Sequence, residues 1–479
     1  MHMQASSPLF VDLDGTLIKT DLLVESFLSL LVEQPLAALR APMWLARGKS
    51  ALKHEIAGRI ELDAAALPYN EDLLAWLRQQ REGGRRIFLA TASNERLAQR
   101  VADHLGVFDG VLASDEARNL SGVRKLEAIR GVAGDDFTYA GNDHVDVPIW
   151  QAARGSIAVG APAGILRDLK SRGNLEAEFE GGSGGLKALV RALRPQQWLK
   201  NLLVFLPLLP LAKAAGVQMP HMLLQCLLAF VAFSLCASAV YVVNDLSDLP
   251  SDRAHPRKRK RPFASGAASA VHGILAVPLL LAVAFAIAAS VSWLFTTVLF
   301  IYLVITTAYT FLLKRYALID VLTLAGLYTI RVIGGAAAIA VVPSFWILAF
   351  SMFVFYSLAL AKRYAELDTM RALNREGAKG RGYHVADISA VQLMGISSGL
   401  LSVLVMALYI NSPEILTRYR HPQWLWGVCP LLMLWVSRVW LKAARSEMTD
   451  DPLVFAVKDK MSRLTIAAAG LLVLASLLW

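Results

Sequence analysis

The chain has two regions that differ in how apolar and polar positions alternate. Up to about residue 170, short apolar runs of β type alternate with helical stretches such as Asn94–Leu105. The apolar runs are Leu9–Leu13, Arg86–Ala90, Gly110–Ala113, Phe137–Ala140 and Ser156–Val159. Strands that alternate with helices predict a parallel sheet covered by helices on both faces. The Leu- and Ala-rich segment 19–84 lies between the first two runs, and we expect it to form a helical cap above the sheet.

From about residue 195 onward, the apolar runs are long enough to cross a membrane. Residues 267–313 contain no Asp, Glu, Lys or Arg, and a spanning helix needs roughly 20 apolar residues. The pattern predicts nine spans, near 199–216, 221–245, 267–289, 292–312, 317–341, 344–363, 387–410, 423–443 and 462–479. We therefore expect an α/β domain over residues 1–175, a Gly-rich linker over 176–193 and an all-α polytopic membrane domain over 194–479.

Composition supports this division and indicates an orientation. The chain is 56% hydrophobic with a mean hydropathy of +0.47, which is too apolar for an ordinary soluble protein. Its basic excess falls in loops between apolar spans, so the net charge of +10 does not indicate nucleic acid as a partner. The basic loops 253–261, 314–315, 362–381 and 442–463 fall on one side of the predicted spans. The positive-inside rule makes that side cytoplasmic. We expect a multi-pass protein of the inner (cytoplasmic) membrane, in contact with the lipid bilayer, with the N-terminal domain on the cytoplasmic side.

An acidic segment at the end of one apolar run carries candidate chemistry. Asn244, Asp245, Asp248 and Asp252 have the spacing N-D-x-x-D-x-x-x-D, which places the three aspartates on one face of a continuous helix. Clustered carboxylates suit Mg²⁺, which proteins usually bind together with substrate phosphates. A basic run follows directly, and it contains Arg253, His255, Arg257, Lys258, Arg259, Lys260 and Arg261. The three aspartates followed by this basic run, at the end of an apolar segment, predict a binding site for a diphosphate substrate at a membrane surface. The alternative for the basic run is anchoring on anionic lipid headgroups.

Other polar residues lie at the same predicted face or within the spans. Lys362, Arg363 and Glu366 end the sixth span, where the cations can hold phosphate and Glu366 can supply a further metal ligand. Ionisable residues at membrane depth usually face a cavity or a partner. The alternative for Arg331, which lies inside a span, is a structural pair with Asp320. The remaining candidates for substrate binding are Lys200, Asn201 and Lys314.

The membrane region resembles the UbiA superfamily of intramembrane transferases, and within it the decaprenyl-phosphate phosphoribosyltransferase branch. The stretches that carry this resemblance are RPQQWLKN (194–201), NDLSDLPSDRAHPRKRKRPFASG (244–266), LKRYALID (313–320), IRVIGG (330–335) and AKRYAEL (361–367). The resemblance implies that a polyprenyl phosphate attacks C1 of phosphoribosyl diphosphate while Asp245, Asp248 and Asp252 hold Mg²⁺. The alternative within the superfamily is an aromatic prenyltransferase carrying an unrelated phosphatase.

The N-terminal region resembles the haloacid dehalogenase (HAD) superfamily, a Rossmann-like fold. The resemblance rests on VDLDGTL (11–17), Thr91 in FLATAS, Lys125 in KLEAIR, and GNDHVDVPIW (141–150). It implies that Asp12 is a nucleophile that forms an aspartyl-phosphate, that Asp14 is the general acid/base, and that Thr91 and Lys125 bind phosphate. It also implies that Mg²⁺ is shared by Asp12, the Asp14 carbonyl and the last motif.

The last HAD motif departs from the family pattern, which has Gly-Asp where this chain has Gly141-Asn142. Asp143 or Asp146 is then the candidate for the missing acid, with a weaker metal site as the alternative. We expect a bifunctional enzyme in which the HAD domain removes the 5-phosphate from the pentosyl lipid. A HAD domain that only binds and regulates is the alternative to this second activity.

Overall fold

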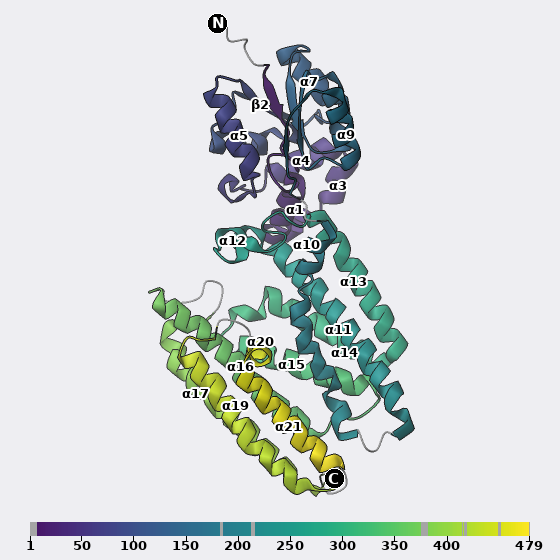
Figure 1. The fold of residues 1–479 in the computed structure, drawn as a ribbon, viewed down its shortest axis with the longest axis vertical. Helices are drawn as coiled ribbons and strands as arrows, with labels where there is room; N and C mark the ends of the chain where they lie inside the picture. Colours follow the sequence, from purple (N-terminus) through teal and green to yellow (C-terminus); the bar gives the residue numbers. More distant parts are fainter. Residues whose placement is uncertain are drawn as a thin grey trace. The chain divides into compact units, whose positions relative to one another are not determined.

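The computed structural model describes residues 7–182, 185–211, 216–374, 382–413, 415, 419–448 and 452–478. The chain divides into two compact units (Figure 1). Unit 1 comprises Met1–Leu193 and Tyr241–Val277, and unit 2 comprises Arg194–Val240 and Pro278–Trp479. The segment with Asp245, Asp248 and Asp252 therefore belongs to the same compact unit as the α/β domain.

Unit 1 is built on a parallel sheet, as the alternating pattern predicts, but the sheet has six strands where the pattern predicted five. The strands are β1 (Leu9–Val11), β2 (Ile87–Asn94), β3 (Gly110–Ser114), β4 (Thr138–Gly141), β5 (Gly155–Val159) and β6 (Leu175–Phe179). Their order is β3-β2-β1-β4-β5-β6. In register, Val11 of β1 is paired with Leu89 of β2 and with Ala140 of β4. This order places β1 at the centre, so residues that follow β1 lie at the middle of the carboxyl edge of the sheet.

Helices cover both faces of the sheet. Leu9 and Val11 pack in one core cluster with residues of α5 (Glu71–Glu82) and α6 (Glu95–Leu105), whereas Phe10 packs in another with residues of α7 (Val123–Ala133), α8 (Val147–Ala152) and α9 (Ala163–Arg172). The alternation follows from the period of two in a strand. Between β1 and β2 lie the predicted cap helices α1 (Leu22–Glu33), α2 (Pro35–Ala38), α3 (Ala41–Ala46) and α4 (Lys49–Ala57), followed by η1 (Ala64–Ala66).

The predicted domain boundary at residue 175 is wrong, because the sheet continues beyond it. Leu175–Phe179 forms β6 and pairs in parallel with β5. Within the predicted linker, Gly185–Ala192 forms helix α10, whereas Ser183 and Gly184 lie outside the described residues. The α/β domain therefore extends at least to Phe179.

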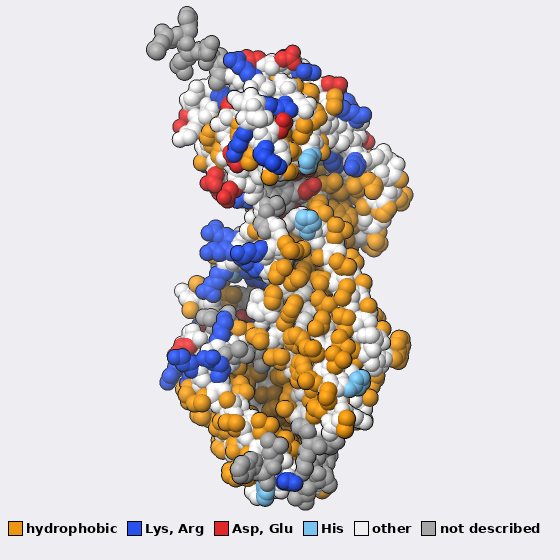
Figure 2. All heavy atoms as spheres, turned by 45° about the vertical axis from the view of Figure 1, so that its right-hand side comes forward, with side chains coloured by type: hydrophobic (Ala, Val, Ile, Leu, Met, Phe, Trp, Pro, Cys, Tyr) orange, Lys and Arg blue, Asp and Glu red, His pale blue; other side chains and the backbone are white. Residues whose placement is uncertain are grey.

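The second half of the chain is helical. Its long elements are α11 (Met219–Ser247), α13 (Ala270–Val291), α14 (Trp293–Phe311), α15 (Ile319–Ala338), α16 (Phe345–Ala372), α17 (Ile388–Ile410), α19 (Val428–Ala444) and α21 (Lys460–Leu478). The short elements are α12 (Leu249–Ala254), α20 (Pro452–Lys458), η3 (Pro195–Leu211), η4 (Gly216–Gln218), η5 (Lys258–Lys260), η6 (Leu313–Arg315), η7 (Val385–Asp387) and η8 (Pro422–Gly427). The short helix η2 (His144–Asp146) belongs to the α/β domain, where it follows β4. Hydrophobic side chains cover most of the visible surface of this helical region, as expected for helices that contact lipid (Figure 2).

Within the described residues, eight helices are long and apolar enough to cross a membrane, not nine. They correspond to the second through ninth predicted spans. The first predicted span, near 199–216, is instead the 3₁₀ helix η3, and residues 212–215 lie outside the described residues. Pro207 and Pro210 lie in this stretch, and each removes one backbone N–H that an α-helix interior would use for its hydrogen bonds. The chain is a multi-pass membrane protein.

Candidate active sites

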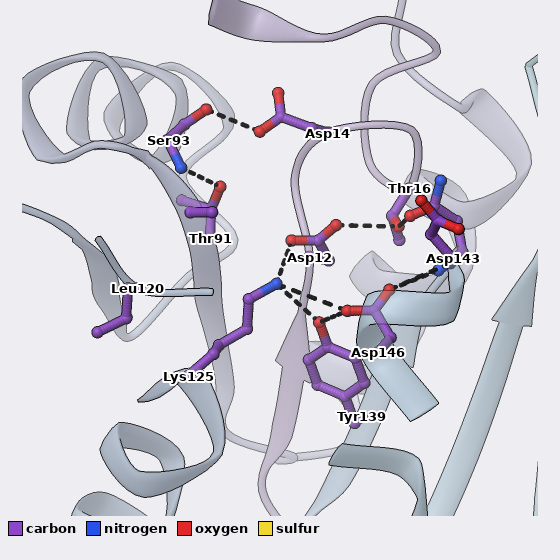
Figure 3. Close-up of polar contacts among 12 residues, drawn as sticks. Asp12, Asp14, Thr16, Thr91, Ser93, Leu120, Lys125, Tyr139, Asp143 and Asp146 are labelled. Carbon is purple, nitrogen blue, oxygen red and sulfur yellow. Dashed lines mark hydrogen bonds and ion pairs between the residues drawn. The ribbon is translucent and has the colours of Figure 1, made fainter. Parts of the chain in front are cut away.

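The residues of the HAD-like motifs converge at the carboxyl edge of the sheet (Figure 3). Asp12 follows β1 directly, Thr91 lies in the adjacent β2, and Asn142 follows β4 on the other side of β1. Crevices outside the carboxyl ends of parallel strands are where ligands bind in open α/β sheets. The structure therefore brings together the first, second and last predicted motifs.

Asp12 is buried and paired with Lys125 of α7. The Lys125 Nζ lies 2.7 Å from Asp12 Oδ1, and both side chains are less than a tenth exposed. Burial raises the pKa of Asp12, and the Lys125 ammonium opposes that rise. Burial would lower the pKa of Lys125, but attraction to Asp12 and Asp146 outweighs it, so the pKa of Lys125 is raised. A charged lysine beside Asp12 favours the carboxylate form, which is the form a nucleophile needs.

Asp14 is held at the start of the cap. Its Oδ1 accepts a hydrogen bond from the Leu22 amide of α1 at 2.7 Å, and its Oδ2 accepts one from Ser93 Oγ at 2.7 Å. Burial raises the pKa of Asp14 to about 6. A carboxyl that titrates near this value can both donate and accept a proton near neutral pH, as general acid–base catalysis requires.

The last HAD-like motif, at residues 141–150, has Asn142 where the family pattern has an aspartate. Asn142 Oδ1 accepts a hydrogen bond from Thr16 Oγ1 at 3.2 Å, and Thr16 also points to Asp12 Oδ2 at 3.5 Å. The loop between them needs Gly15, whose φ is +75° and whose added Cβ would lie 2.2 Å from Asn142 Nδ2. Asp12 and Asn142 thus offer two side-chain oxygens to one small region.

Asp143 and Asp146 have other contacts in the structure. Asp146 is buried, its Oδ1 accepts from the Tyr139 hydroxyl at 2.7 Å, and its Oδ2 accepts from the amides of Asn142 and Asp143. Asp143 is exposed and caps the His144 amide. The predicted replacement of the missing acid by Asp146 is therefore not seen, because both of its oxygens are engaged in holding the loop. In the described part of the chain, no three His, Cys, Asp or Glu side chains form a group that could hold a metal ion.

Several polar residues of this site were not predicted. Ser93 is one of them: its amide donates to the hydroxyl of the predicted residue Thr91, which is fully buried, at 3.0 Å. Ser93 contacts Asp14, as described above, and the Tyr139 hydroxyl accepts from Lys125 at 2.9 Å. Lys53 of α4 donates to the Ala92 carbonyl at 2.6 Å. Ser93 lies two residues after Thr91 on β2, a spacing that was available in the sequence, whereas Lys53 is placed only by the folding of the cap.

The acidic segment does not form the continuous helix that its spacing predicts. Helix α11 ends at Ser247, Asp248 lies outside helical geometry, and α12 begins at Leu249. Pro250 is the physical reason, because its nitrogen cannot donate a hydrogen bond back to Leu246. Asp248 instead accepts a hydrogen bond from Asn244 Nδ2 at 3.1 Å.

Asp245 and Asp252 nevertheless converge on one guanidinium. Arg261 Nη1 lies 3.1 Å from Asp245 Oδ1 and 2.5 Å from Asp252 Oδ2. Burial raises the pKa of Asp252, and Arg261 opposes that rise. Asp252 Oδ1 is buried and accepts no hydrogen bond within the described residues, with Lys258 Nζ 3.9 Å away. Two buried carboxylates with one unsatisfied oxygen fit a hard divalent cation such as Mg²⁺.

The basic run after Asp252 divides into structural and exposed parts. Arg253 does not have the predicted phosphate-binding position: it is paired with Glu25 of α1 and donates to the Ala264 carbonyl. His255 Nδ1 accepts from the amides of Arg257 and Lys258, so it shapes the turn. Lys258 and Arg259 are exposed and remain available for an anionic ligand.

In unit 2, Arg331 and Asn201 form one polar cluster inside the helical bundle. Arg331 Nε donates to Asn201 Oδ1 at 2.7 Å, and its Nη2 donates to the Tyr302 hydroxyl at 3.1 Å. Asn201 Nδ2 donates to Ser234 at 2.9 Å. The alternative of a structural pair between Arg331 and Asp320 is not seen, because Asp320 pairs with Arg363 instead. Lys200 lies over the ring of Tyr328, 5.5 Å from its centroid.

A second cluster in unit 2 surrounds Arg363. Its guanidinium pairs with Asp320 and Glu366 and donates to the Tyr309 hydroxyl at 3.1 Å. Arg363 is 1% exposed and Asp320 is fully buried. Arg363 therefore holds Asp320 and Glu366 in place rather than presenting a free cation to phosphate, as the sequence had predicted. Lys362 and Lys314 are half-buried beside these elements.

We expect Arg363→Ala to destabilise the protein by about 3–5 kcal/mol, because it leaves the buried Asp320 carboxylate without its counter-charge. Arg371→Ala is the matched control on the same helix, since Arg371 pairs with Asp368 but is 57% exposed, and exposed pairs contribute only about 0–1 kcal/mol. Thermal unfolding in detergent measures both. An unchanged melting temperature for Arg363→Ala, together with weaker binding of a diphosphate substrate, would restore the predicted phosphate-binding role.

A Rossmann-like domain with paired catalytic-type aspartates is followed, within the residues that the structure describes, by eight helices that could cross a membrane. Together they define a multi-pass membrane enzyme with a hydrolase-type domain. The chain belongs to the UbiA prenyltransferase family, whose sequence model matches residues 203–466. A haloacid dehalogenase-like hydrolase model matches residues 9–150. Both matches confirm the two resemblances seen in the motifs.

Similar proteins share one or both regions. The uncharacterized protein y4nM of Sinorhizobium fredii is 38% identical over 459 residues, which is 95% of this chain and 88% of that protein. Nodulation protein NoeC of Azorhizobium caulinodans is 33% identical over 58% of this chain and 90% of its own length. The decaprenyl-phosphate phosphoribosyltransferase of Mycolicibacterium smegmatis is 36% identical over 41% of this chain and 61% of its own length.

Proposed function

We propose that the membrane domain transfers 5-phosphoribose from phosphoribosyl diphosphate to a polyprenyl phosphate, and that the HAD domain then removes the 5-phosphate. The convergence of buried Asp245 and Asp252 on Arg261, next to an exposed basic run, is the observation that carries the transfer step. Similarity to proteins named decaprenyl-phosphate phosphoribosyltransferase supports this donor and acceptor. The cytoplasmic face of the inner membrane, where soluble phosphoribosyl diphosphate is available, is the proposed location.

In the transfer step, a phosphate oxygen of the lipid attacks C1 of the ribose, and the bond from C1 to the diphosphate oxygen breaks with its electron pair. Asp245 and Asp252 would hold Mg²⁺, which would offset the charge on the departing diphosphate. Lys258 and Arg259 are the candidates to bind phosphate oxygens, because charge-assisted hydrogen bonds to phosphate are strong and directional. The prenyl chain requires only apolar surface.

In the hydrolytic step, Asp12 attacks phosphorus of the 5-phosphate, and Asp14 protonates the departing ribose oxygen. Asp14 then takes a proton from the water that cleaves the aspartyl-phosphate, which releases inorganic phosphate and restores Asp12. Lys125 holds Asp12 in place and offsets charge on the phosphoryl group. Asp12 and Asn142 are the side chains that would share Mg²⁺ with the Asp14 carbonyl, and the ion would neutralise phosphoryl oxygens.

Diphosphate release tests the transfer step with the full-length protein in lipid nanodiscs. We expect diphosphate to appear only when phosphoribosyl diphosphate and polyprenyl phosphate are both present with Mg²⁺. The competing function is prenyl transfer to an aromatic acceptor, and the matching family is named for prenyl transfer. Suppose that diphosphate is released from a prenyl diphosphate in the presence of 4-hydroxybenzoate, and none from phosphoribosyl diphosphate with polyprenyl phosphate. The prenyl-transfer function would then replace our proposal.

Asn142 makes the metal site of the HAD domain weak, and restoring an acid there should strengthen it. We expect Asn142→Asp to lower the Mg²⁺ concentration for half-maximal phosphomonoester hydrolysis by about tenfold, since ligand charge sets the affinity for hard cations. Asp143→Asn is the control, because Asp143 is exposed and caps His144. A larger loss of Mg²⁺ affinity in Asp143→Asn would show that Asp143 supplies the missing acid.

A further inference from the structure

Helix α1 of the cap contacts the acidic segment through a buried ion pair. Glu25 of α1 accepts from Arg253 Nη1 at 2.7 Å and from Arg253 Nη2 at 2.5 Å. The two side chains are 8% and 7% exposed, and both residues belong to unit 1. A bidentate, buried pair of this kind fixes the relative position of its two backbones more firmly than a surface pair does.

Apolar contacts surround this pair. Leu28 of α1 packs in one buried cluster with Leu246, Leu249 and Phe263, which flank the aspartates. The backbone at Gly266 also lies close to Lys19. Gly266 has a φ of +72°, and a Cβ added to it would lie 2.6 Å from Lys19 Cβ. The acidic segment is thus packed against the α/β domain through an interface with an apolar cluster and a central charge pair.

Hydrogen bonds continue this interface in both directions. On the HAD side, Glu25 also accepts from Thr20 Oγ1 at 2.7 Å, and the first turn of α1 is held by Asp14. On the other side, Arg253 Nε donates to the Ala264 carbonyl at 3.0 Å, across the basic turn from Asp252. Arg253 therefore joins α12 and the end of the basic turn to α1.

We infer that Glu25, although it belongs to the hydrolase domain, is a positioning residue for the transfer reaction. It holds Arg253, and through Arg253 it sets where Asp252 and Arg261 lie. This inference rests on the proposed transfer function. Misplacing reacting groups by about 1 Å can reduce a rate about 100-fold, so a cap contact with no substrate of its own can control the transfer rate.

Three variants of the full-length protein in nanodiscs test this role: Glu25→Ala, Glu25→Gln and the reversed pair Glu25→Arg with Arg253→Glu. We expect Glu25→Ala to lower kcat of transfer 10- to 100-fold while KM for polyprenyl phosphate stays within twofold. Hydrogen exchange of the backbone amides of 249–262 should rise in Glu25→Ala. Glu25→Gln keeps the shape of the side chain, so its kcat of transfer should lie between those of Glu25→Ala and the wild type. The reversed pair should recover most of the kcat that Glu25→Arg or Arg253→Glu loses alone. Glu33→Gln, at the exposed end of α1, is the control and should match the wild type.

Hydrolysis of a soluble phosphomonoester by Glu25→Ala should stay within twofold of the wild type, which separates positioning from unfolding. Wild-type transfer and wild-type exchange in Glu25→Ala would overturn the inference. Parallel loss of both activities without recovery in the reversed pair would also overturn it, because the pair would then serve folding alone. If the wild type makes no pentosyl lipid, the proposed function fails, and the exchange data still decide whether Glu25 orders the acidic segment.

The cap also carries an exposed apolar surface that the fold does not use. We define the cap surface by Leu31, Val32, Leu36, Leu39, Met43 and Leu45, whose exposed fractions run from 46% to 80%. The neighbouring Ala38 and Trp44 are buried and pack into the core of the domain. Six large apolar side chains within fifteen residues form a patch of the kind that marks an interaction site.

The basic residues near the cap surface favour an anionic partner. Residues 34–52 contain Arg40, Arg47 and Lys49 and no Asp or Glu, and Arg47 pairs with Glu55 just beyond them. The first 190 residues together have 21 Lys and Arg against 25 Asp and Glu. Apolar side chains flanked by basic ones in short helices are typical of segments that lie in a membrane interface containing anionic lipid. We propose that the cap surface docks on the anionic lipid surface of the membrane that the chain spans.

Spin labels in the full-length protein test this docking. The three native cysteines, Cys226, Cys236 and Cys429, are buried and free, and are replaced by Ala in this experiment. In nanodiscs containing phosphatidylglycerol, we expect a label at Leu39→Cys to be relaxed more by oxygen than by a water-soluble nickel chelate. Gln79→Cys, exposed on α5, is the control and should show the reverse. Relaxation of the Leu39→Cys label like the control would overturn the proposal, as would spin–spin broadening that shows a second copy on this surface.

Discussion

Replacing Asp252 by Asn should reduce pentosyl transfer by about 1000-fold or more, while hydrolysis by the HAD domain continues at the wild-type rate. A 1000-fold loss is about 4 kcal/mol of transition-state stabilisation, the scale expected when a ligand for a catalytic metal loses its charge. Asn keeps the shape of the buried side chain and a hydrogen-bond acceptor for Arg261, so the segment should still fold. Asp245→Asn should behave in the same way, since Asp245 meets the same guanidinium.

Radiolabelled phosphoribosyl diphosphate, followed into the lipid fraction, measures this loss. Asp387→Asn is the control, because Asp387 accepts a hydrogen bond from the His384 amide beside η7, and its loss should leave transfer within about twofold. Transfer at a near-normal rate in Asp252→Asn would mean that the paired carboxylates only stabilise the turn around Arg261.

Replacing Asp12 by Asn should abolish phosphomonoester hydrolysis, with a loss of at least about 1000-fold, and leave transfer within twofold. The carboxamide has the same shape but lacks the nucleophilic oxygen. Lys125 then faces a neutral partner but keeps Asp146 at 3.7 Å as a counter-charge. Release of inorganic phosphate from the completed transfer reaction is the measurement. Asp168→Asn, on the exposed side of α9, is the control.

The strands and motif positions of the α/β domain could be predicted because their signals are local. Four motifs in order predict that Asp12, Thr91, Lys125 and Asn142 lie near one sheet edge, as the structure has them. The sixth strand was missed because LEAEF (175–179) alternates Glu with apolar residues next to a Gly-rich stretch and reads as a polar linker. Polar alternation is what an edge strand with one solvated face requires.

The contacts of the charged residues could not be predicted, because they join positions far apart in the chain. Arg363 and Asp320 are 43 positions apart, and Arg253 and Glu25 are 228 apart. Spacing alone suggested that Arg253 and Arg363 bind phosphate, whereas folding gives each a carboxylate partner. The acidic segment was misjudged for a local reason: the face argument assumed a continuous helix, and Pro250 ends it.

The mass of the lipid product tests the central claim, that one chain both attaches phosphoribose and removes its 5-phosphate. Wild type and Asp12→Asn are incubated in the same nanodiscs with phosphoribosyl diphosphate, polyprenyl phosphate and Mg²⁺, and the lipids are analysed by mass spectrometry. We expect the wild type to yield polyprenyl-phosphoryl-ribose and Asp12→Asn to yield the same lipid heavier by one phosphate, HPO₃. If both proteins yield the phosphorylated lipid, the HAD domain is not its phosphatase; if neither yields a pentosyl lipid, the transfer itself is contradicted.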